Sequence, residues 1–192
     1  IGIALGSGTD TAKESSDLVL TNNNLKIIVY AIKEGRVIIQ NIRKVITYLL
    51  ATGFSEIILI GGSIIAGLPL PVLPAQILWA NIIQEGFMNF AYAFEKEEGD
   101  VMHGNGNYNK GKNVLFTREM KILIFVIGII TDIFLLILFL ALLKLDYDLG
   151  KIRTIMFAGL SMDAVFFALS LKSLKKPIWK INIFGNIYLI AA

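Results

Sequence analysis

Two acidic residues, Glu56 and Glu85, stand inside apolar stretches that are long enough to cross a membrane. A charged side chain in hydrocarbon costs about 2.5–3.5 kcal/mol on insertion scales, so such a residue usually faces the interior of a helix bundle. Asn81 precedes Glu85 by one helical turn, which places both side chains on the same helix face. Carboxylate and amide oxygens are ligands that calcium and related hard cations prefer. The pattern therefore predicts a cation site between two neighbouring membrane helices.

Two further polar residues extend this candidate site. Gln84 is adjacent to Glu85, and Asp163 lies in the middle of a later apolar stretch. For Asp163, a hydrogen bond to Ser161 or to a neighbouring helix explains the residue equally well. Glu56 and Glu85 could also be buried acids that are paired to another helix or lie near a membrane surface. Two acids on adjacent stretches, with amides beside them, favour the cation site.

The surroundings of these residues raise two other expectations. Asp132 stands alone among Ile, Phe and Leu residues, and we expect it to have a structural partner rather than a cation. Gly53, Gly61 and Gly62 lie near Glu56 and allow that helix either a close approach to a neighbour or local unwinding. Unwinding frees backbone carbonyl groups, which is a common way to build an ion site within a membrane.

The composition sets the class of protein in which these residues lie. Apolar residues make up 55% of the 192-residue chain and the mean hydropathy is +0.68, well above an ordinary soluble domain. We predict a mainly α fold, a polytopic transmembrane helix bundle with a small α/β remnant at the N-terminus. The expected membrane spans are residues 45–68, 72–94, 122–143 and 152–171, with the start of another at 183–192. The chain has no cysteine, which excludes disulfides and thiolate metal sites.

Residues 1–24 have the pattern of an α/β unit. Two apolar runs typical of strands enclose a Gly-rich turn and a short helix expected over residues 12–16. Asp10 or Thr11 can cap that helix, and Thr11 followed by Glu14 fits a capping box. The alternation of strand and helix suggests the edge of a larger α/β domain. The chain opens without Met and stops inside an apolar segment, so we expect it to be part of a longer protein.

Residues 25–44 have helical periodicity and no strong breaker before the first span, so we expect one continuous stalk helix that enters the membrane. Lys44 and most other charged residues of the stalk are expected on faces away from its apolar stripe. Basic residues also mark the connections 95–121 and 172–180. The positive-inside rule places these connections and the stalk on the cytoplasmic side, and the uncharged turn at Pro69–Pro71 on the other.

Several motifs resemble the P-type cation-transporting ATPases. Ile1–Gly6 and Gly8–Leu20 look like the end of the phosphorylation domain of that family. Glu34–Lys44 resembles its stalk signature, Pro74–Asn81 resembles the sixth transmembrane helix of the calcium-pump-like branch, and Asp100–Met102 resembles the motif that follows. The resemblance extends over essentially the whole chain.

The resemblance implies a reaction in which ATP hydrolysis through an aspartyl phosphate drives cations across a bilayer. It assigns residues 1–24 to the phosphorylation domain, 25–44 to the stalk and 45–192 to the transmembrane domain. It also implies that ATP and Mg2+ bind in a part of the protein before Ile1, so that this chain holds no catalytic or cofactor-binding residue. The transported cation would be calcium, Ca2+, or another hard cation.

The same resemblance assigns roles to the candidate ligands. Glu56, Asn81 and Glu85 match oxygen ligands of the transported ion in this family. Glu85 stands where calcium pumps usually have Asp, and Gln84 replaces a Thr ligand. Asp163 falls near an acidic ligand of the eighth transmembrane helix.

The expected partners are the lipid bilayer, the transported cation and the N-terminal part of the same protein, with no nucleic acid. The expected location is the cell membrane. Two other classes of protein stay open: a secondary cation transporter or channel, and a non-pumping membrane module with structural acids. The α/β remnant joined to a stalk helix argues against a secondary transporter. An Asp-Lys-Thr-Gly-Thr motif upstream of Ile1 would identify a pump.

Overall fold

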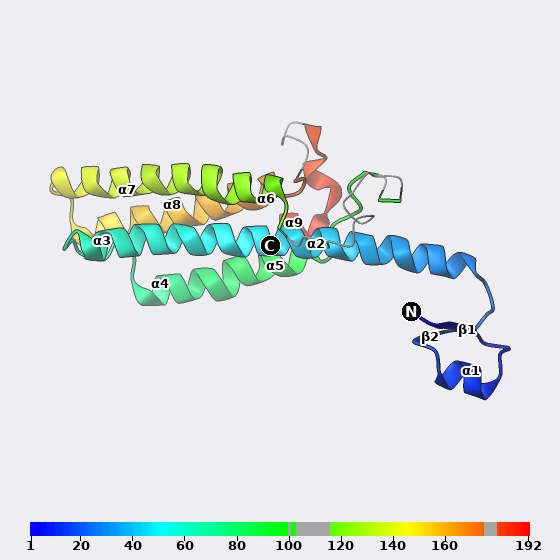
Figure 1. Ribbon diagram of the computed structural model, residues 1–192. Coiled ribbons are helices and arrows are strands. Elements are labelled where there is room, and N and C mark those ends of the chain that lie inside the picture. The colour runs from blue at the N-terminus through cyan, green and yellow to red at the C-terminus, as the bar shows by residue number, and fades with distance from the viewer. Residues whose placement is uncertain (100, 103–115, 175–179) are drawn as a thin grey trace.

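The structure is a computed structural model that describes residues 1–99, 101–102, 116–174 and 180–192. It is a bundle of long helices, from which one helix projects toward a small α/β unit at the N-terminus (Figure 1). The mainly α fold expected from the sequence is confirmed.

The N-terminal unit consists of β1 (Ile3–Leu5), α1 (Asp10–Glu14) and β2 (Leu18–Leu20). The two strands pair in parallel, with Ala4 opposite Val19. A helix joins them, as parallel strands require a crossover connection. The unit has the strand–helix–strand order that the apolar runs predicted.

The start of α1 differs from the expectation. The helix begins at Asp10, and its N-cap is Thr9, whose Oγ1 accepts a hydrogen bond from the Ala12 N–H at 3.3 Å. The capping box expected at Thr11 and Glu14 is therefore wrong, because both residues already lie inside the helix. Thr9 satisfies the N–H of Ala12 in the first turn, whereas a cap at Thr11 would serve an N–H group two residues later.

One long helix connects the N-terminal unit to the bundle. α2 (Lys26–Glu56) continues through a π-helical segment, η1 (Ile57–Gly61), into α3 (Gly62–Ile65) without a break. The continuous helix expected from the sequence is confirmed. Its buried side chains recur every three or four residues from Asn41 onward, whereas the preceding part projects from the bundle (Figure 1).

The helices that follow α3 pack along α2 on both of its sides (Figure 1). Two of their segments, η2 and η4, are π-helical, and η6 is a short 3-10 turn. In chain order they are α4 (Pro74–Trp79), η2 (Ala80–Glu85), α5 (Gly86–Tyr92), α6 (Arg118–Ile122), η4 (Leu123–Gly128), α7 (Ile129–Lys144), α8 (Leu149–Ser170), η6 (Ile183–Gly185) and α9 (Ile187–Ala191).

Three helices in the described ranges are long and apolar enough to cross a membrane: Lys26–Ile65, Arg118–Lys144 and Leu149–Ser170. They contain the first, third and fourth expected spans. The second expected span is also one continuous helix, from α4 to α5, but it is not among the three. Polar side chains such as Asn81 and Glu85 lower its mean hydropathy. These are the residues that made this segment a candidate for ion binding.

Two apolar clusters form the core of the bundle, one toward each end. Near the end from which α2 projects, the buried residues include Tyr48, Met88, Tyr92, Ile124 and Phe167. Toward the other end they include Leu59, Val72, Leu135, Phe139 and Met156. The acids that lie between these two sets along their helices are Glu56, Glu85, Asp132 and Asp163. We call these four residues the mid-span acids; they form a polar layer between two apolar layers.

Candidate cation site

The polar layer contains a cavity between α2, η2 and α8. Its empty space, counted to its open mouth, is about 440 Å³. Its polar lining residues are Thr52, Ser55, Glu56, Gln76, Gln84, Glu85, Ser161 and Asp163. The expected ligands other than Asn81 therefore meet in one cavity, although they come from three separate helices.

Asn81 lies beside the cavity rather than in its lining. The side chain is exposed, and its Nδ2 donates a hydrogen bond to Glu56 Oε2 at 3.4 Å. One turn away on both helices, Thr52 Oγ1 donates to Glu85 Oε2 at 3.0 Å. These two bonds join α2 and η2 as antiparallel neighbours. Each of them orients one carboxylate at the cavity wall.

Gln84 and Asp163 connect the same cavity to other helices. Gln84 is buried, and its Nε2 donates to the backbone carbonyl of Ser161 on α8 at 2.8 Å. Asp163 is half-buried and faces Thr131 of α7, whose hydroxyl donates to the carbonyl of Gly128 at 2.9 Å. Asp163 also lines the cavity, and its role as an ion ligand stays a prediction.

The backbone beside the acids is π-helical. η1 begins one residue after Glu56, and η2 contains Asn81, Gln84 and Glu85. A π-helical segment bonds residue i to i+5, and such segments often occur at functional sites. The helix that carries Glu56 therefore widens but stays continuous, and does not unwind as the glycines had allowed.

Only one of the three glycines near Glu56 faces a neighbouring helix among the described residues. A Cβ on Gly62 would lie 3.7 Å from Leu136 of α7, whereas a Cβ on Gly53 or Gly61 would have no neighbour within 4 Å. Gly62 thus faces α7, at a distance where a Cβ would make an ordinary van der Waals contact. No signal in the sequence distinguished Gly62 from the other two.

Asp132 lies on α7 behind the cavity lining. Its side chain is fully buried, and neither carboxylate oxygen has a hydrogen-bond partner within the part of the chain that the structure describes. Its polar neighbour there is Ser55 of α2, whose hydroxyl faces the carboxyl group but donates to the carbonyl of Ala51 at 3.2 Å, so the structural partner expected from the sequence stays a prediction.

Carboxylates alone do not complete a metal centre here. In the described ranges no three His, Cys, Asp or Glu side chains are close enough to hold a metal ion between them. A hard cation such as Ca2+ binds about six to eight oxygens, which include amides, hydroxyls and backbone carbonyls. A cation in this cavity would therefore draw on Thr52, Ser55 and Gln84 as well as on the acids.

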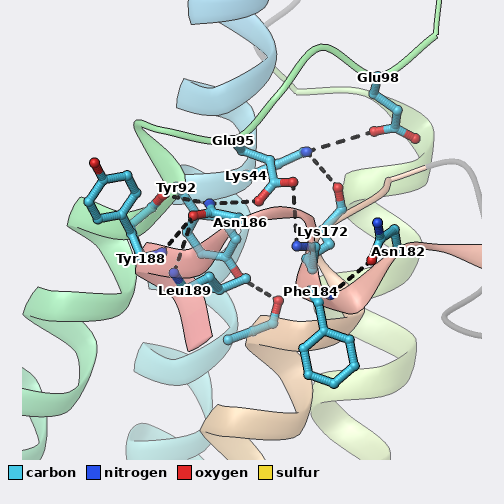
Figure 2. Close-up of polar contacts among 12 residues, drawn as sticks. Lys44, Tyr92, Glu95, Glu98, Lys172, Asn182, Phe184, Asn186, Tyr188 and Leu189 are labelled. Carbon is cyan, nitrogen blue, oxygen red and sulfur yellow. Dashed lines mark hydrogen bonds and ion pairs between the residues drawn. The ribbon is translucent and has the colours of Figure 1, made fainter. Parts of the chain in front are cut away.

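A second group of buried charges was missed by sequence reasoning. We call it the stalk-side cluster; its members are Lys44, Glu95, Glu98 and Lys172 (Figure 2). The side chains of both lysines are 1% exposed, and those of Glu95 and Glu98 are 9% and 14% exposed. Lys44 Nζ lies 3.9 Å from Glu98 Oε2, and Lys172 Nζ lies 3.7 Å from Glu95 Oε1. The cluster therefore contains two ion pairs.

Hydrogen bonds extend the stalk-side cluster to four segments of the chain. Lys44 Nζ donates to the carbonyl of Lys172 at 2.6 Å, which ties α2 to the end of α8. The Ser173 hydroxyl donates to Glu98. The Asn186 Nδ2 donates to Glu95 Oε2 at 2.9 Å, at the start of α9 (Figure 2). The cluster thus holds α2, the segment after α5, the end of α8 and α9 together.

The expectation that Lys44 faces away from the buried stripe of α2 is wrong. Asn41, Lys44 and Tyr48 are all buried, and their spacing of three and four residues places them on one face. That spacing was visible in the sequence. A lysine is almost never fully buried unless it is paired, and the partners of Lys44 lie far away along the chain.

Fold and site together define a class: a helical membrane domain with an acidic cavity between two apolar layers. The chain belongs to the cation-transporting ATPases, because the family model described as cation transporting ATPase, C-terminus, matches residues 69–192. The resemblance to P-type calcium pumps noted from the motifs is confirmed by the relatives.

These relatives are named calcium-transporting ATPases. The chain is 37% identical to one from Bacillus subtilis (strain 168) over 100% of its own length and 22% of that protein. It is 35% identical to calcium-transporting ATPase 1 of Bacillus cereus over 99% of the chain and 23% of that protein. An endoplasmic reticulum-type pump of Arabidopsis thaliana is 40% identical over 53% of the chain and 10% of its own length. The chain thus spans less than a quarter of these relatives.

Proposed function

We propose that the chain is the C-terminal membrane part of an ATP-driven pump for Ca2+, in which Glu56, Asn81, Gln84, Glu85 and Asp163 supply ligands to the transported ion. The names of the relatives support Ca2+ as the cargo. The whole protein would hydrolyse ATP with Mg2+ in the part that this chain does not include. As in the sequence-based expectation, we place the pump in the cell membrane.

The observation that carries this proposal is the acidic cavity between the two apolar clusters. Glu56, Glu85 and Asp163 line it from different helices, and each is half-buried. Several ionisable groups that share a cavity inside a membrane bundle repel one another, and each also costs free energy to desolvate. A bound divalent cation removes both costs, because its charge compensates two carboxylates and it replaces water as their partner.

The hydrogen bonds at the site would also serve ion binding. Asn81 and Gln84 now use their amide nitrogens as donors, to Glu56 and to the Ser161 carbonyl. The nitrogen and oxygen of a side-chain amide exchange places when the group turns over, so each can present an oxygen instead. Thr52 holds the Glu85 carboxylate from the other side. The ligands are therefore partly oriented before an ion arrives.

The connection to ATP hydrolysis would run through α2. The helix that carries Glu56 extends unbroken from Lys26 to Ile65, and its first part leads to the N-terminal α/β unit (Figure 1). A rigid helix can convey a displacement at one end to a ligand near the other.

The test uses the full-length protein in membranes. Glu56→Gln and Glu85→Gln keep the side-chain shape but remove a charge that a divalent ion needs, so each should abolish Ca2+-dependent phosphorylation from ATP. Glu34→Gln is the matched control, because Glu34 is exposed on α2 and remote from the cavity; it should behave as wild type. Wild-type Ca2+ dependence in both cavity variants would show that the acids are structural.

A further inference from the structure

The connection between α3 and α4 lies at the end of the bundle away from the projecting part of α2 (Figure 1). We call residues 66–73 the far-end turn. It contains no charged residue, and its Pro69 and Pro71 have no N–H group to donate. Its first half is bonded back to α3, since the Leu68 N–H donates to the Ser63 carbonyl at 2.9 Å. The prolines limit such bonds in the second half, so contacts with other helices matter there.

Arg153 of α8 supplies one such contact. Its Nε donates to the carbonyl of Leu70, in the second half of the far-end turn, at 3.2 Å. Asp148, the acid that precedes α8, is used differently, because its carboxylate accepts from the N–H groups of Gly150 and Lys151 and caps the helix. A charged donor forms a stronger hydrogen bond than a neutral one. Arg153 therefore ties the far-end turn to α8.

Arg153 also continues the face of α8 that lines the cation cavity. Phe157, Ser161 and Ala164 of α8 are among the lining residues. Arg153 precedes Phe157 by four residues, so it lies on the same face of the helix, one turn closer to the far-end turn. The cavity and the bond to Leu70 are thus on one side of α8.

Val72 connects the far-end turn to the cavity. It follows Leu70 by two residues and is 1% exposed, because it packs in the apolar cluster of this end of the bundle, which includes Met156 of α8. Val72 also lines the cavity. Farther along α4, the ring of Trp79 packs edge to face on Phe157 of α8, with 5.7 Å between centroids. Contacts of the turn and of α4 with α8 therefore close this end of the cavity.

The two ends of the bundle are held by bonds of different strength. In the stalk-side cluster, the bond from Lys44 to the Lys172 carbonyl lies among ion pairs, and both lysine side chains are 1% exposed. Arg153, by contrast, is half-buried, so water can replace the Leu70 carbonyl as its acceptor. The far-end contact therefore costs less free energy to open than the contacts of the stalk-side cluster.

We propose that Arg153 is a positioning residue that keeps the far end of the cation cavity closed. Its bond to Leu70 holds Val72 against α8, and the transported ion exchanges with that side of the membrane after this bond breaks. The inference rests on the proposed function. The charge of Arg153 adds to the barrier, because a fixed positive charge opposes the entry of a cation from that side.

The experiment uses the full-length protein in sealed vesicles whose ATP-hydrolysing part faces outward, so that the far-end turn faces the interior. ATP hydrolysis and Ca2+ uptake are measured together, and efflux is measured without ATP from vesicles loaded passively with radioactive Ca2+. Arg153→Gln should raise efflux about 10-fold, the effect of losing one hydrogen bond from a charged group, and should lower Ca2+ uptake per ATP. The Ca2+ concentration that half-saturates ATP hydrolysis should not change, because Glu56 and Glu85 are intact.

Lys151→Gln is the matched control, because it removes the same charge from the same turn of α8. Lys151 is exposed and lies off the face that lines the cavity, and its bond to Asp148 is made by the backbone N–H, which the substitution keeps. Its efflux and its uptake per ATP should equal those of wild type. If Arg153→Gln does not fold, Val72→Ala replaces it, since a smaller side chain loosens the same closure and should also raise efflux.

The outcomes separate this inference from the proposed function. Wild-type efflux and wild-type uptake per ATP in Arg153→Gln would overturn the role of Arg153 and leave the pump proposal standing. Equal losses of hydrolysis and uptake, with efflux unchanged, would indicate a purely structural role and would also overturn it. Where Val72→Ala is the variant used, unchanged efflux rejects the closure. Failure of the wild-type protein to accumulate Ca2+ would overturn both proposals.

Discussion

The bundle buries charge in two regions and compensates it in opposite ways. In the stalk-side cluster, Lys44 and Lys172 are paired with Glu98 and Glu95, so that positive and negative charges balance. Among the described residues, none of the mid-span acids forms an ion pair. Their partners are hydroxyl and amide groups, as at Thr52 and Asn81, and Asp132 has no hydrogen bond to the part of the chain that the structure describes.

This difference predicts different roles for the two regions: the stalk-side cluster contributes to stability, and the mid-span acids contribute to ion binding. A balanced set of buried charges with hydrogen bonds has one favourable arrangement, and removal of either partner leaves the other uncompensated. Under the proposed function, a cation compensates the unbalanced set of acids. We therefore expect variants of the stalk-side cluster to lower stability, and variants of the mid-span acids to lower ion binding.

The largest effect is expected from Lys44→Met, which leaves Glu98 buried without its ammonium partner. It should lower the free energy of unfolding of the full-length protein by about 3–5 kcal/mol. Lys33→Met is the matched control, because the Lys33–Glu97 pair at 2.9 Å is 39% and 42% exposed. Surface pairs contribute only about 0–1 kcal/mol. Thermal unfolding in detergent measures both, and equal losses would show that the stalk-side cluster has no special role.

A smaller effect is expected from Thr52→Val, which removes the hydroxyl that donates to Glu85 Oε2 at 3.0 Å. The carboxylate loses its orientation, so apparent Ca2+ affinity in phosphorylation assays should fall about 3- to 10-fold, the equivalent of roughly one hydrogen bond. Thr154→Val provides the control, since the Thr154 hydroxyl bonds the carbonyl of Gly150 on an exposed face of α8. An identical Ca2+ affinity in the two variants would argue against a role for Thr52 at the site.

The smallest effect is expected on stability from Glu85→Gln in the absence of Ca2+. The change removes a half-buried charge that has no basic partner among the described residues, and the Thr52 hydroxyl can still donate to the new amide oxygen. The free energy of unfolding should change by less than about 1 kcal/mol. Because the substitution removes a charge without a basic partner, the expected direction of this change is an increase. A loss as large as that in Lys44→Met would remove the contrast between the two regions.

Much of the fold could be predicted because its signals are local. Apolar stretches of membrane length, the helical periodicity of residues 25–44 and the absence of a breaker predicted the long helix that the structure contains. The acids of the candidate site were visible for a related reason: Glu56 and Glu85 interrupt apolar runs in which charge is costly. The cap of α1 was mispredicted because Thr9 and Thr11 both suit an N-cap, and local sequence does not decide between them.

The sequence by itself determined which helices form, which of them are apolar enough for a membrane, and that acidic residues lie within them. These properties depend on neighbours a few residues apart. Only the tertiary structure decided that Lys44 is buried, since its partners Glu98 and Lys172 come from distant segments. It also decided that Asp132 is fully buried without a hydrogen bond to any described residue, because burial depends on how α7 packs against α2 and α8. Burial and pairing are properties of contacts between helices, and no periodicity within one helix specifies them.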